Sequence, residues 1–243
     1  FDYEGYLAAL AGPEPHWPDS TRAVSELRLS LRVQPAGMMG ALTGPRTVHL
    51  DIVDYPGEWL LDLTLMERDY ATWAAEVLAR IPGRAGADPF LQAQQATDGA
   101  AVFEETGARD LARLFADHLR AARAEGWSDC TPGRFLLPGD LAGSPALTFA
   151  PLARPDRPGR QSLWREFERR FEAYKARVVR PFFRDHFAGL DRQIVLVDLL
   201  SALDHGPGAV ADLREAMTEI LRAYRPGVNS WLGIQVTPLS TTV

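Results

Sequence analysis

A short apolar segment that ends in an aspartate, with a glycine three residues further on, constrains the fold of this chain more than any other feature. The segment is Arg46–Asp54, Gly57 follows it, and a long helical pattern begins directly afterwards. We expect Arg46–Asp54 to be a buried strand that brings the Asp54 carboxylate to the carboxyl edge of a sheet, where open α/β sheets bind ligands. There Asp54 can hold Mg²⁺ that bridges two phosphates, and the small Gly57 lets its backbone N–H approach a terminal phosphate. By itself the pattern fits equally well an ordinary strand and turn with a capping aspartate.

Two further segments have the pattern of strands. Val24–Val33 places apolar residues at every second position, which predicts a half-buried strand. The linker to Arg46–Asp54 is short and rich in glycine and proline, so we expect the two segments to pair antiparallel. Gln193–Leu200 is an apolar run with branched residues and predicts a buried strand of a parallel sheet. Because helical patterns dominate residues 83–190, we predict an α/β fold with a large helical insertion between strands.

Helical periodicity, with apolar residues three and four positions apart, marks the rest of the chain. The aromatic stripe of Ser162–Phe183 favours a place in the core over a groove for a partner, and Pro181 is expected to kink or end that helix. Trp127–Arg160 is rich in proline and glycine and is expected to be irregular. The expected helices are Tyr3–Leu10, Glu58–Ile81, Pro89–Ala96, Asp110–Ala124, Ser162–Phe183 and Pro207–Tyr224.

The composition excludes several classes of protein. The formal net charge of −6 argues against nucleic-acid binding, which requires clustered cations. No apolar run is long enough to cross a bilayer. The single cysteine, Cys130, excludes an internal disulfide and a cysteine-only zinc site, so we expect a cytoplasmic protein.

The stretch around Asp54 carries a resemblance to known proteins. Leu50–Gly57 resembles the switch II strand of Ras-like GTPases, and the longer string Asp54–Leu63, DYPGEWLLDL, resembles the YcjX-like family of P-loop proteins. The resemblance implies a P-loop NTPase-like sheet in a bacterial, stress-associated GTP-binding protein, often encoded beside a small inner-membrane protein. Further stretches similar to that family are Thr21–Leu29, Pro132–Leu141 and Asp191–Asp198.

The resemblance also implies roles for individual residues. Asp54 becomes the Mg²⁺ contact and Gly57 the contact to the nucleotide's phosphate. Thr21 stands where a switch I threonine binds both nucleotide and Mg²⁺, although Ser20 and Ser25 are chemically equivalent candidates. Glu58 follows the glycine, where many GTPases place the residue that positions water, so it is the catalytic candidate, with a surface charge as the alternative.

Two parts of a nucleotide site are missing from these 243 residues. No glycine-rich loop ends in Gly-Lys-Ser/Thr, and the only lysine, Lys175, lies in a predicted helix. No Asn/Thr-Lys-x-Asp sequence is present to read guanine. We therefore expect residues 1–243 to be one incomplete P-loop NTPase-like domain, cut from a longer protein before Phe1, that binds nucleotide weakly by itself.

The sequence leaves three functions open. The first is GTP hydrolysis with Mg²⁺ as a conformational switch, with an inner-membrane protein as the partner that the resemblance implies and a position peripheral to that membrane. The second is an ATPase, and the third is a nucleotide-free module whose helical block binds a partner. The oligomeric state is not predicted. Asp198 is interpreted as a helix cap, and Pro132–Asp140 as an ordered loop without assigned chemistry.

Overall fold

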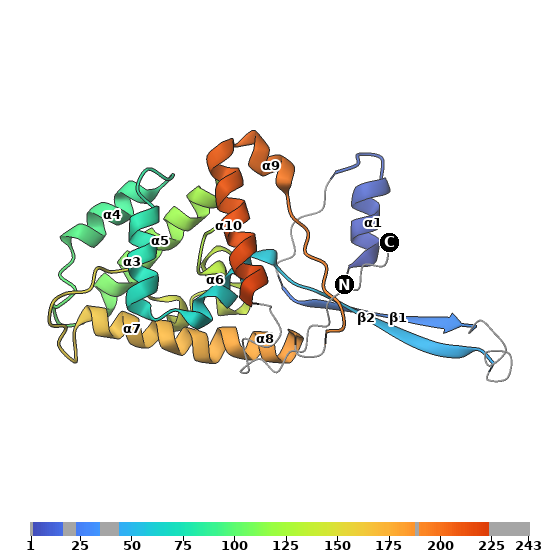
Figure 1. The fold of residues 1–243 in the computed structure, drawn as a ribbon, viewed down its shortest axis with the longest axis horizontal. Helices are drawn as coiled ribbons and strands as arrows, with labels where there is room; N and C mark the ends of the chain where they lie inside the picture. The colour runs from blue at the N-terminus through green and yellow to red at the C-terminus, as the bar shows by residue number, and fades with distance from the viewer. Residues whose placement is uncertain (1, 17–22, 35–43, 188–189, 224–243) are drawn as a thin grey trace. The chain divides into compact units, whose positions relative to one another are not determined.

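The computed structural model describes residues 2–16, 23–34, 44–187 and 190–223. The chain divides into two compact units, residues 1–56 and residues 57–243, and each is described by itself. The described fold is α/β, with many helices and a two-stranded antiparallel sheet (Figure 1). The expectation that residues 1–243 form one domain stays a prediction. Within the described residues, no helix is both long and apolar enough to span a membrane.

The first unit contains a helix and a β-hairpin, as predicted. Helix α1 (Tyr3–Ala11) begins at Asp2, whose side chain accepts a hydrogen bond from the Gly5 N–H. Strands β1 (Ser25–Val33) and β2 (Arg46–Asp54) pair antiparallel, with Leu29 opposite Leu50. The alternating pattern of β1 and the short linker therefore predicted both the element type and the pairing.

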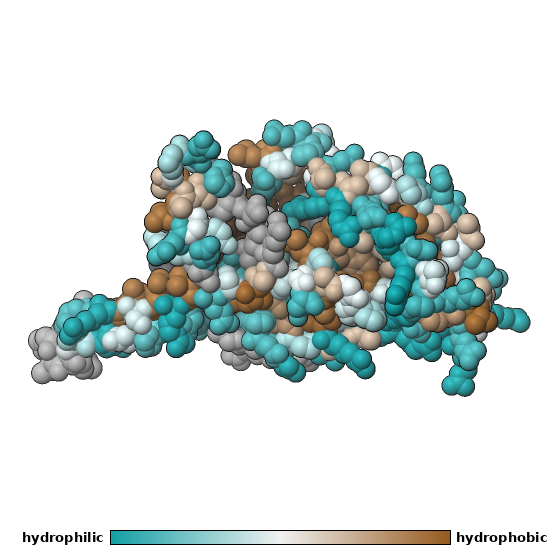
Figure 2. Space-filling model, turned by 180° about the vertical axis from the view of Figure 1, so that it is seen from behind, coloured by the Kyte–Doolittle hydropathy of each residue, from teal (hydrophilic) through white to brown (hydrophobic). Residues whose placement is uncertain are grey.

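The burial expected for the two strands is wrong. Residues that face each other across the hairpin share a face, and the apolar face carries Leu31 and Leu50, each 46% exposed. The opposite face is polar and includes a bidentate Arg28–Asp51 pair. Figure 2 shows hydrophobic residues along one side of this hairpin and hydrophilic residues along the other. The physical reason is that α1 has no buried residue, so no second layer of the described part of the unit covers the apolar face.

The second unit is built from helices. The segment expected as an insertion, residues 83–190, contains several of them. The elements are η1 (Gly57–Glu67), α3 (Tyr70–Arg80), α4 (Ala87–Ala96), α5 (Glu105–Ala124), α6 (Gly133–Leu136), η2 (Gly139–Leu141), η3 (Pro145–Leu147), α7 (Leu163–Tyr174), η4 (Lys175–Val179), α8 (Arg180–Phe187), α9 (Leu199–Asp204) and α10 (Pro207–Ala223).

The strand predicted over Gln193–Leu200 is absent from the described residues. Residues 192–198 have no regular structure, and α9 begins at Leu199. The side chain of Leu196 is 91% exposed. A strand requires a neighbour for its backbone hydrogen bonds, and the sheet of the described residues consists of β1 and β2, without this run. The run is apolar, as its sequence shows, but apolar composition alone does not determine whether a strand is present to pair with it.

The helix predicted over Glu58–Ile81 is two elements. Its first part is the 3₁₀ segment η1, and α3 follows after a break at residues 68–69. Asp69 begins α3, because its side chain accepts a hydrogen bond from the Thr72 N–H at 2.7 Å. The apolar spacing predicted helix throughout, and the capping aspartate decides where the second helix starts.

The helix predicted over Ser162–Phe183 continues past Pro181. One π-helical turn, η4, joins α7 to α8, and Pro181 falls in the first turn of α8. Proline is tolerated in a first turn, and the wider π turn before it accommodates the lost hydrogen bond. Figure 1 shows α7 and α8 as one rod along the lower side of the unit, with α3 and α10 crossing above it.

The core of the second unit is aromatic. Trp73 of α3 stacks on Phe171 of α7 at a ring-centroid distance of 5.0 Å. Tyr70 contacts the same helix and donates its hydroxyl to the Ala150 carbonyl at 2.7 Å. The aromatic stripe of α7 is thus core, as predicted. Its buried members are Trp164, Phe167, Phe171 and Tyr174.

A buried ion pair ties α10 to the loops around it. Arg84 Nη2 lies 2.7 Å from Asp212 Oδ1, and both side chains are less than one-tenth exposed, at 7% and 6%. Asp212 Oδ2 also accepts the backbone N–H groups of Ser128 and Asp129. The guanidinium of Arg84 lies over the ring of Trp127 at 4.1 Å. Each charge is therefore compensated, which a buried pair requires.

Removing one partner of this pair should destabilise the second unit strongly. Asp212→Ala leaves the Arg84 charge and two backbone donors without their acceptor, so we expect a loss of about 3–5 kcal/mol in the free energy of unfolding. Urea denaturation measures this loss. The control is Asp117→Ala, whose partners Arg113 and Arg120 are more than half exposed, and it should cost less than about 1 kcal/mol. Equal losses in the two variants would contradict a structural role for the buried pair.

Candidate functional site

Asp54 is the last residue of β2 in the first unit. It is half-buried, and the strand register places it opposite Ser25. Ser25 is the one described member of the three hydroxyl residues considered for Mg²⁺. Thr21 and Ser20 lie outside the described residues. The antiparallel hairpin therefore brings one hydroxyl and the predicted metal-binding carboxylate to the same end of the sheet.

Gly57 and Glu58 begin η1 in the second unit. The Glu58 carboxylate is 20% exposed and its Oε1 lies 3.5 Å from Nη2 of Arg123, near the end of α5. Both residues line a cleft of about 370 Å³, whose other walls come from α5, α9, α10 and residues 195–198. Glu58 is therefore a paired carboxylate at the edge of a cleft.

The predicted site residues fall on both sides of the boundary between the two units. Gly57 and Glu58 are adjacent in one unit, and Asp54 belongs to the other. In the second unit, η1 is deeply embedded, with most of its side chains buried between α6, α10 and η4. The stretch that directly follows the Asp-x-x-Gly pattern is thus part of a packed core.

A buried carboxylate that the sequence reasoning did not single out lies in η1. Asp62 Oδ1 accepts the backbone N–H of Gly133 at 2.8 Å, and Oδ2 accepts the hydroxyl of Tyr174 at 2.7 Å. Burial raises the pKa of Asp62 to about 6, although the Tyr174 and Gly133 hydrogen bonds and the charge of Arg134 lower it in part. The sequence did contain a signal for this buried carboxylate, because Asp62 is the single acidic residue inside the apolar run Trp59–Leu65.

Two residues that could imitate site residues have structural partners. Lys175 is buried, and its ammonium donates to the Arg68 carbonyl at 2.7 Å and to Glu172 at 3.0 Å. Asp198 caps α9, as predicted, by accepting the Ser201 N–H at 2.9 Å. Both side chains are accounted for by the fold.

The described residues can supply a carboxylate ligand to a hard cation whose other ligands are phosphate oxygens and water. Asp54 offers carboxylate oxygens, which are the ligands that Mg²⁺ prefers. No group of three or more His, Cys, Asp or Glu side chains in the described part of the chain could hold a metal ion. Mg²⁺ in nucleotide sites is usually bound by one or two protein ligands together with phosphate oxygens and water, so a single carboxylate fits this use.

Comparison with known proteins gives the family. The family model described as "YcjX-like family, DUF463" matches residues 1–239. This chain belongs to the YcjX-like family. It is 38% identical over 248 aligned residues, 96% of the chain, to a protein of Shewanella oneidensis named Ras-like GTPase YcjX. It is also 38% identical over 241 residues, 93% of the chain, to the protein of the same name in Escherichia coli K12. The resemblance inferred from the motifs is confirmed.

The chain spans about half the length of these curated relatives, 50% of the first and 51% of the second. The match includes the segment from β2 through η1 and the helical elements that pack on it.

The pKa of Asp62 predicts a pH-dependent stability. The folded pKa of about 6 is above the ordinary value of 3.8, so between these values the folded chain keeps a proton that the unfolded chain has released. Stability therefore falls as pH rises through this window. Relative to Asp62→Asn, which carries no titrating carboxyl, the wild-type free energy of unfolding should fall by roughly 2–3 kcal/mol between about pH 4 and about pH 7.

Urea denaturation of both proteins at a series of pH values measures this difference. Taking the difference between the two cancels the titration of the other carboxylates. Parallel stability curves would show that Asp62 titrates normally in the folded chain.

Proposed function

We propose that this chain contributes to a site that binds and hydrolyses GTP with Mg²⁺, as a conformational switch built on a P-loop NTPase-like sheet. The observation that carries the proposal is the 38% identity to two proteins named Ras-like GTPase YcjX, over nearly all of this chain. The aligned region contains the Asp54-x-x-Gly57 pattern, whose chemistry suits a metal and a terminal phosphate. The proposal concerns the complete gene product, because the chain spans half of its relatives.

The roles follow from the residue types. Asp54 and the hydroxyl of Thr21 would hold Mg²⁺, which supplies neutralisation of the phosphate charge when it is bound. The backbone N–H of Gly57 would donate to the terminal phosphate, and release of that phosphate would free the loop. Glu58 would orient the attacking water, and its pairing with Arg123 holds the carboxylate at the cleft rather than in solvent.

A phosphate-binding lysine is still required. Lys175 is committed to Arg68 and Glu172, so we expect the glycine-rich loop and its lysine from another part of the complete gene product. The partner at the inner membrane and the link to stress stay predictions, since they rest on the resemblance alone.

Nucleotide preference tests the first part of the proposal. The complete gene product should bind a fluorescent GTP analogue in the presence of Mg²⁺ more tightly than the matching ATP analogue. Fluorescence titration with unlabelled GTP and ATP as competitors measures the two affinities. Tighter binding of ATP would favour an ATPase, and binding of neither would favour the nucleotide-free module.

Asp54→Ala tests the metal site. We expect the variant to lose the increase in GTP affinity that Mg²⁺ gives the wild type, because the metal loses its protein carboxylate. Titration with and without Mg²⁺ measures this increase. Asp51→Ala is the control, because Asp51 lies on the same strand and pairs with Arg28. If Asp54→Ala and Asp51→Ala respond alike to Mg²⁺, Asp54 is not a metal ligand.

Glu58→Gln tests the catalytic role. The amide keeps the size of the side chain but cannot accept a proton, so kcat should fall about 100-fold or more while the affinity for GTP is unchanged. Phosphate release under saturating GTP gives kcat. Glu67→Gln, an exposed change in the same element, should leave kcat as in the wild type. An unchanged kcat in Glu58→Gln would show that Glu58 is a surface charge without a catalytic role.

A further inference from the structure

The segment Pro132–Asp140, to which the sequence assigned no chemistry, surrounds the side chain of Trp59. The indole N–H of Trp59 donates to the Leu137 carbonyl at 2.8 Å. The guanidinium carbon of Arg134 lies 3.2 Å from the centroid of the Trp59 ring, a cation–π contact with a side chain that is 8% exposed. Trp59 is 3% exposed. One face of the ring and its polar edge are thus both held by a single short segment.

Two glycines of this segment allow the close approach. A Cβ added to Gly133 would lie 1.8 Å from the carbonyl oxygen of Glu58, so any side chain there would displace the Glu58–Trp59 backbone. A Cβ added to Gly139 would lie 3.3 Å from the Trp59 ring, and Gly139 has a φ of +56°. The backbone of Gly133 therefore packs directly on the peptide of the predicted catalytic residue.

The same segment is anchored one turn further along η1. The Gly133 N–H donates to the buried Asp62 carboxylate, which also accepts the hydroxyl of Tyr174. On the other side, Phe182 of α8 packs edge-on against Trp59 at a centroid distance of 5.2 Å. The contacts to Trp59 and Asp62 are hydrogen bonds, a stacked cation and a backbone contact, all of which fix orientation more strictly than apolar burial alone does.

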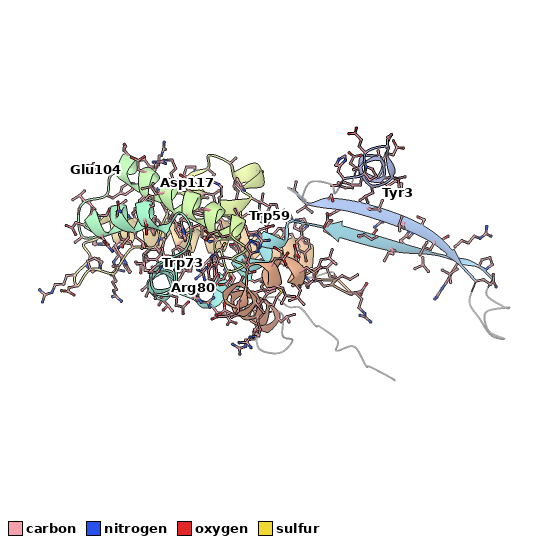
Figure 3. The ribbon with its side chains drawn as sticks, turned by 90° about the horizontal axis from the view of Figure 1, so that it is seen from above. Tyr3, Trp59, Trp73, Arg80, Glu104 and Asp117 are labelled. Carbon is pink, nitrogen blue, oxygen red and sulfur yellow. The ribbon has the colours of Figure 1, made fainter. Side chains whose placement is uncertain are left out.

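Figure 3 shows where this arrangement lies in the second unit. Trp59 and Glu104 lie towards opposite ends of the helical body in that view, and Trp73 lies between them. The aromatic core around Trp73 stabilises the body of the unit, whereas the contacts around Trp59 act on the two residues immediately before it. These are Gly57 and Glu58.

We propose that Pro132–Asp140 is a socket for Trp59 that positions Gly57 and Glu58 for nucleotide hydrolysis. Gly133, Arg134 and Gly139 are positioning residues. Gly133 acts through the backbone of Glu58, and Arg134 and Gly139 act through the ring of Trp59. The inference rests on the proposed function for its catalytic part. Its structural part, that the socket fixes the start of η1, is independent of any nucleotide.

Gly133→Ala tests the socket directly. The added methyl group should push the Glu58 carbonyl away, and kcat for GTP in the complete gene product should fall about 10- to 100-fold, with the KM within twofold of the wild type. Gly107→Ala is the matched control, since Gly107 lies in α5 with nothing within 4 Å of an added Cβ. It should leave kcat and KM unchanged.

Trp59→Phe and Phe90→Leu separate positioning from general destabilisation. Trp59→Phe keeps an aromatic ring but loses the hydrogen bond to Leu137, so kcat should fall while the protein stays folded. Phe90 is fully buried and packs on Phe115, whereas the side chains that pack on the Trp59 ring are Arg134 and Phe182. Phe90→Leu should therefore lower the Tm without lowering kcat. If kcat falls in proportion to the Tm in Gly133→Ala, Trp59→Phe and Phe90→Leu alike, the socket is ordinary core and the proposal is overturned.

Hydrogen exchange on the 243-residue chain without nucleotide gives the second readout. The amides of Gly57–Leu61 should exchange at least tenfold faster in Gly133→Ala and Trp59→Phe than in the wild type, with α10 unchanged. Unchanged exchange at Gly57–Leu61 overturns the socket even if kcat falls. Faster exchange together with no GTP hydrolysis by the wild type supports the fixing of η1 and overturns the proposed function, and with it the catalytic part of this inference.

Discussion

The packing of the second unit depends on a carboxylate in its interior, Asp62. An ionised or polar group at this depth is tolerated only when its oxygens have donors, and here one donor comes from Gly133 and the other from Tyr174. These residues belong to three segments that are far apart in the chain. The hydrogen bonds therefore fix η1, α6 and the end of α7 relative to one another, and the aromatic core packs around that arrangement.

Local signals in the sequence predicted most of the elements. The hairpin follows from alternation in β1 and a short linker, and the helices follow from apolar spacing. The sequence could not predict which element packs against each apolar face. Gln193–Leu200 has the composition of a buried strand, yet residues 192–198 are irregular. The reason is that strand formation depends on a distant hydrogen-bonding partner, whereas helix formation satisfies its backbone within the segment.

The same distinction applies to the candidate site. Asp54, Gly57 and Glu58 were found because their spacing along the chain carries the signal. Asp62 and Arg134 were missed because their roles depend on contacts with residues more than seventy positions away, such as Gly133 for Asp62 and Trp59 for Arg134. Pro132–Asp140 was expected only as an ordered loop in a stretch rich in proline and glycine, and the position of the Glu58 carbonyl explains why Gly133 must lack a side chain.

The π-helical turn between α7 and α8 has a consequence for the surfaces that the two helices present to the rest of the unit. Such a turn is equivalent to one extra residue in an α-helix, which rotates everything after it by about 100°. The rotation lets α7 present its aromatic stripe to Trp73 while α8 presents Phe182 to Trp59. The two halves of one continuous rod therefore have separate packing registers, and Tyr174, at their junction, joins the aromatic stripe of α7 to Asp62 of η1.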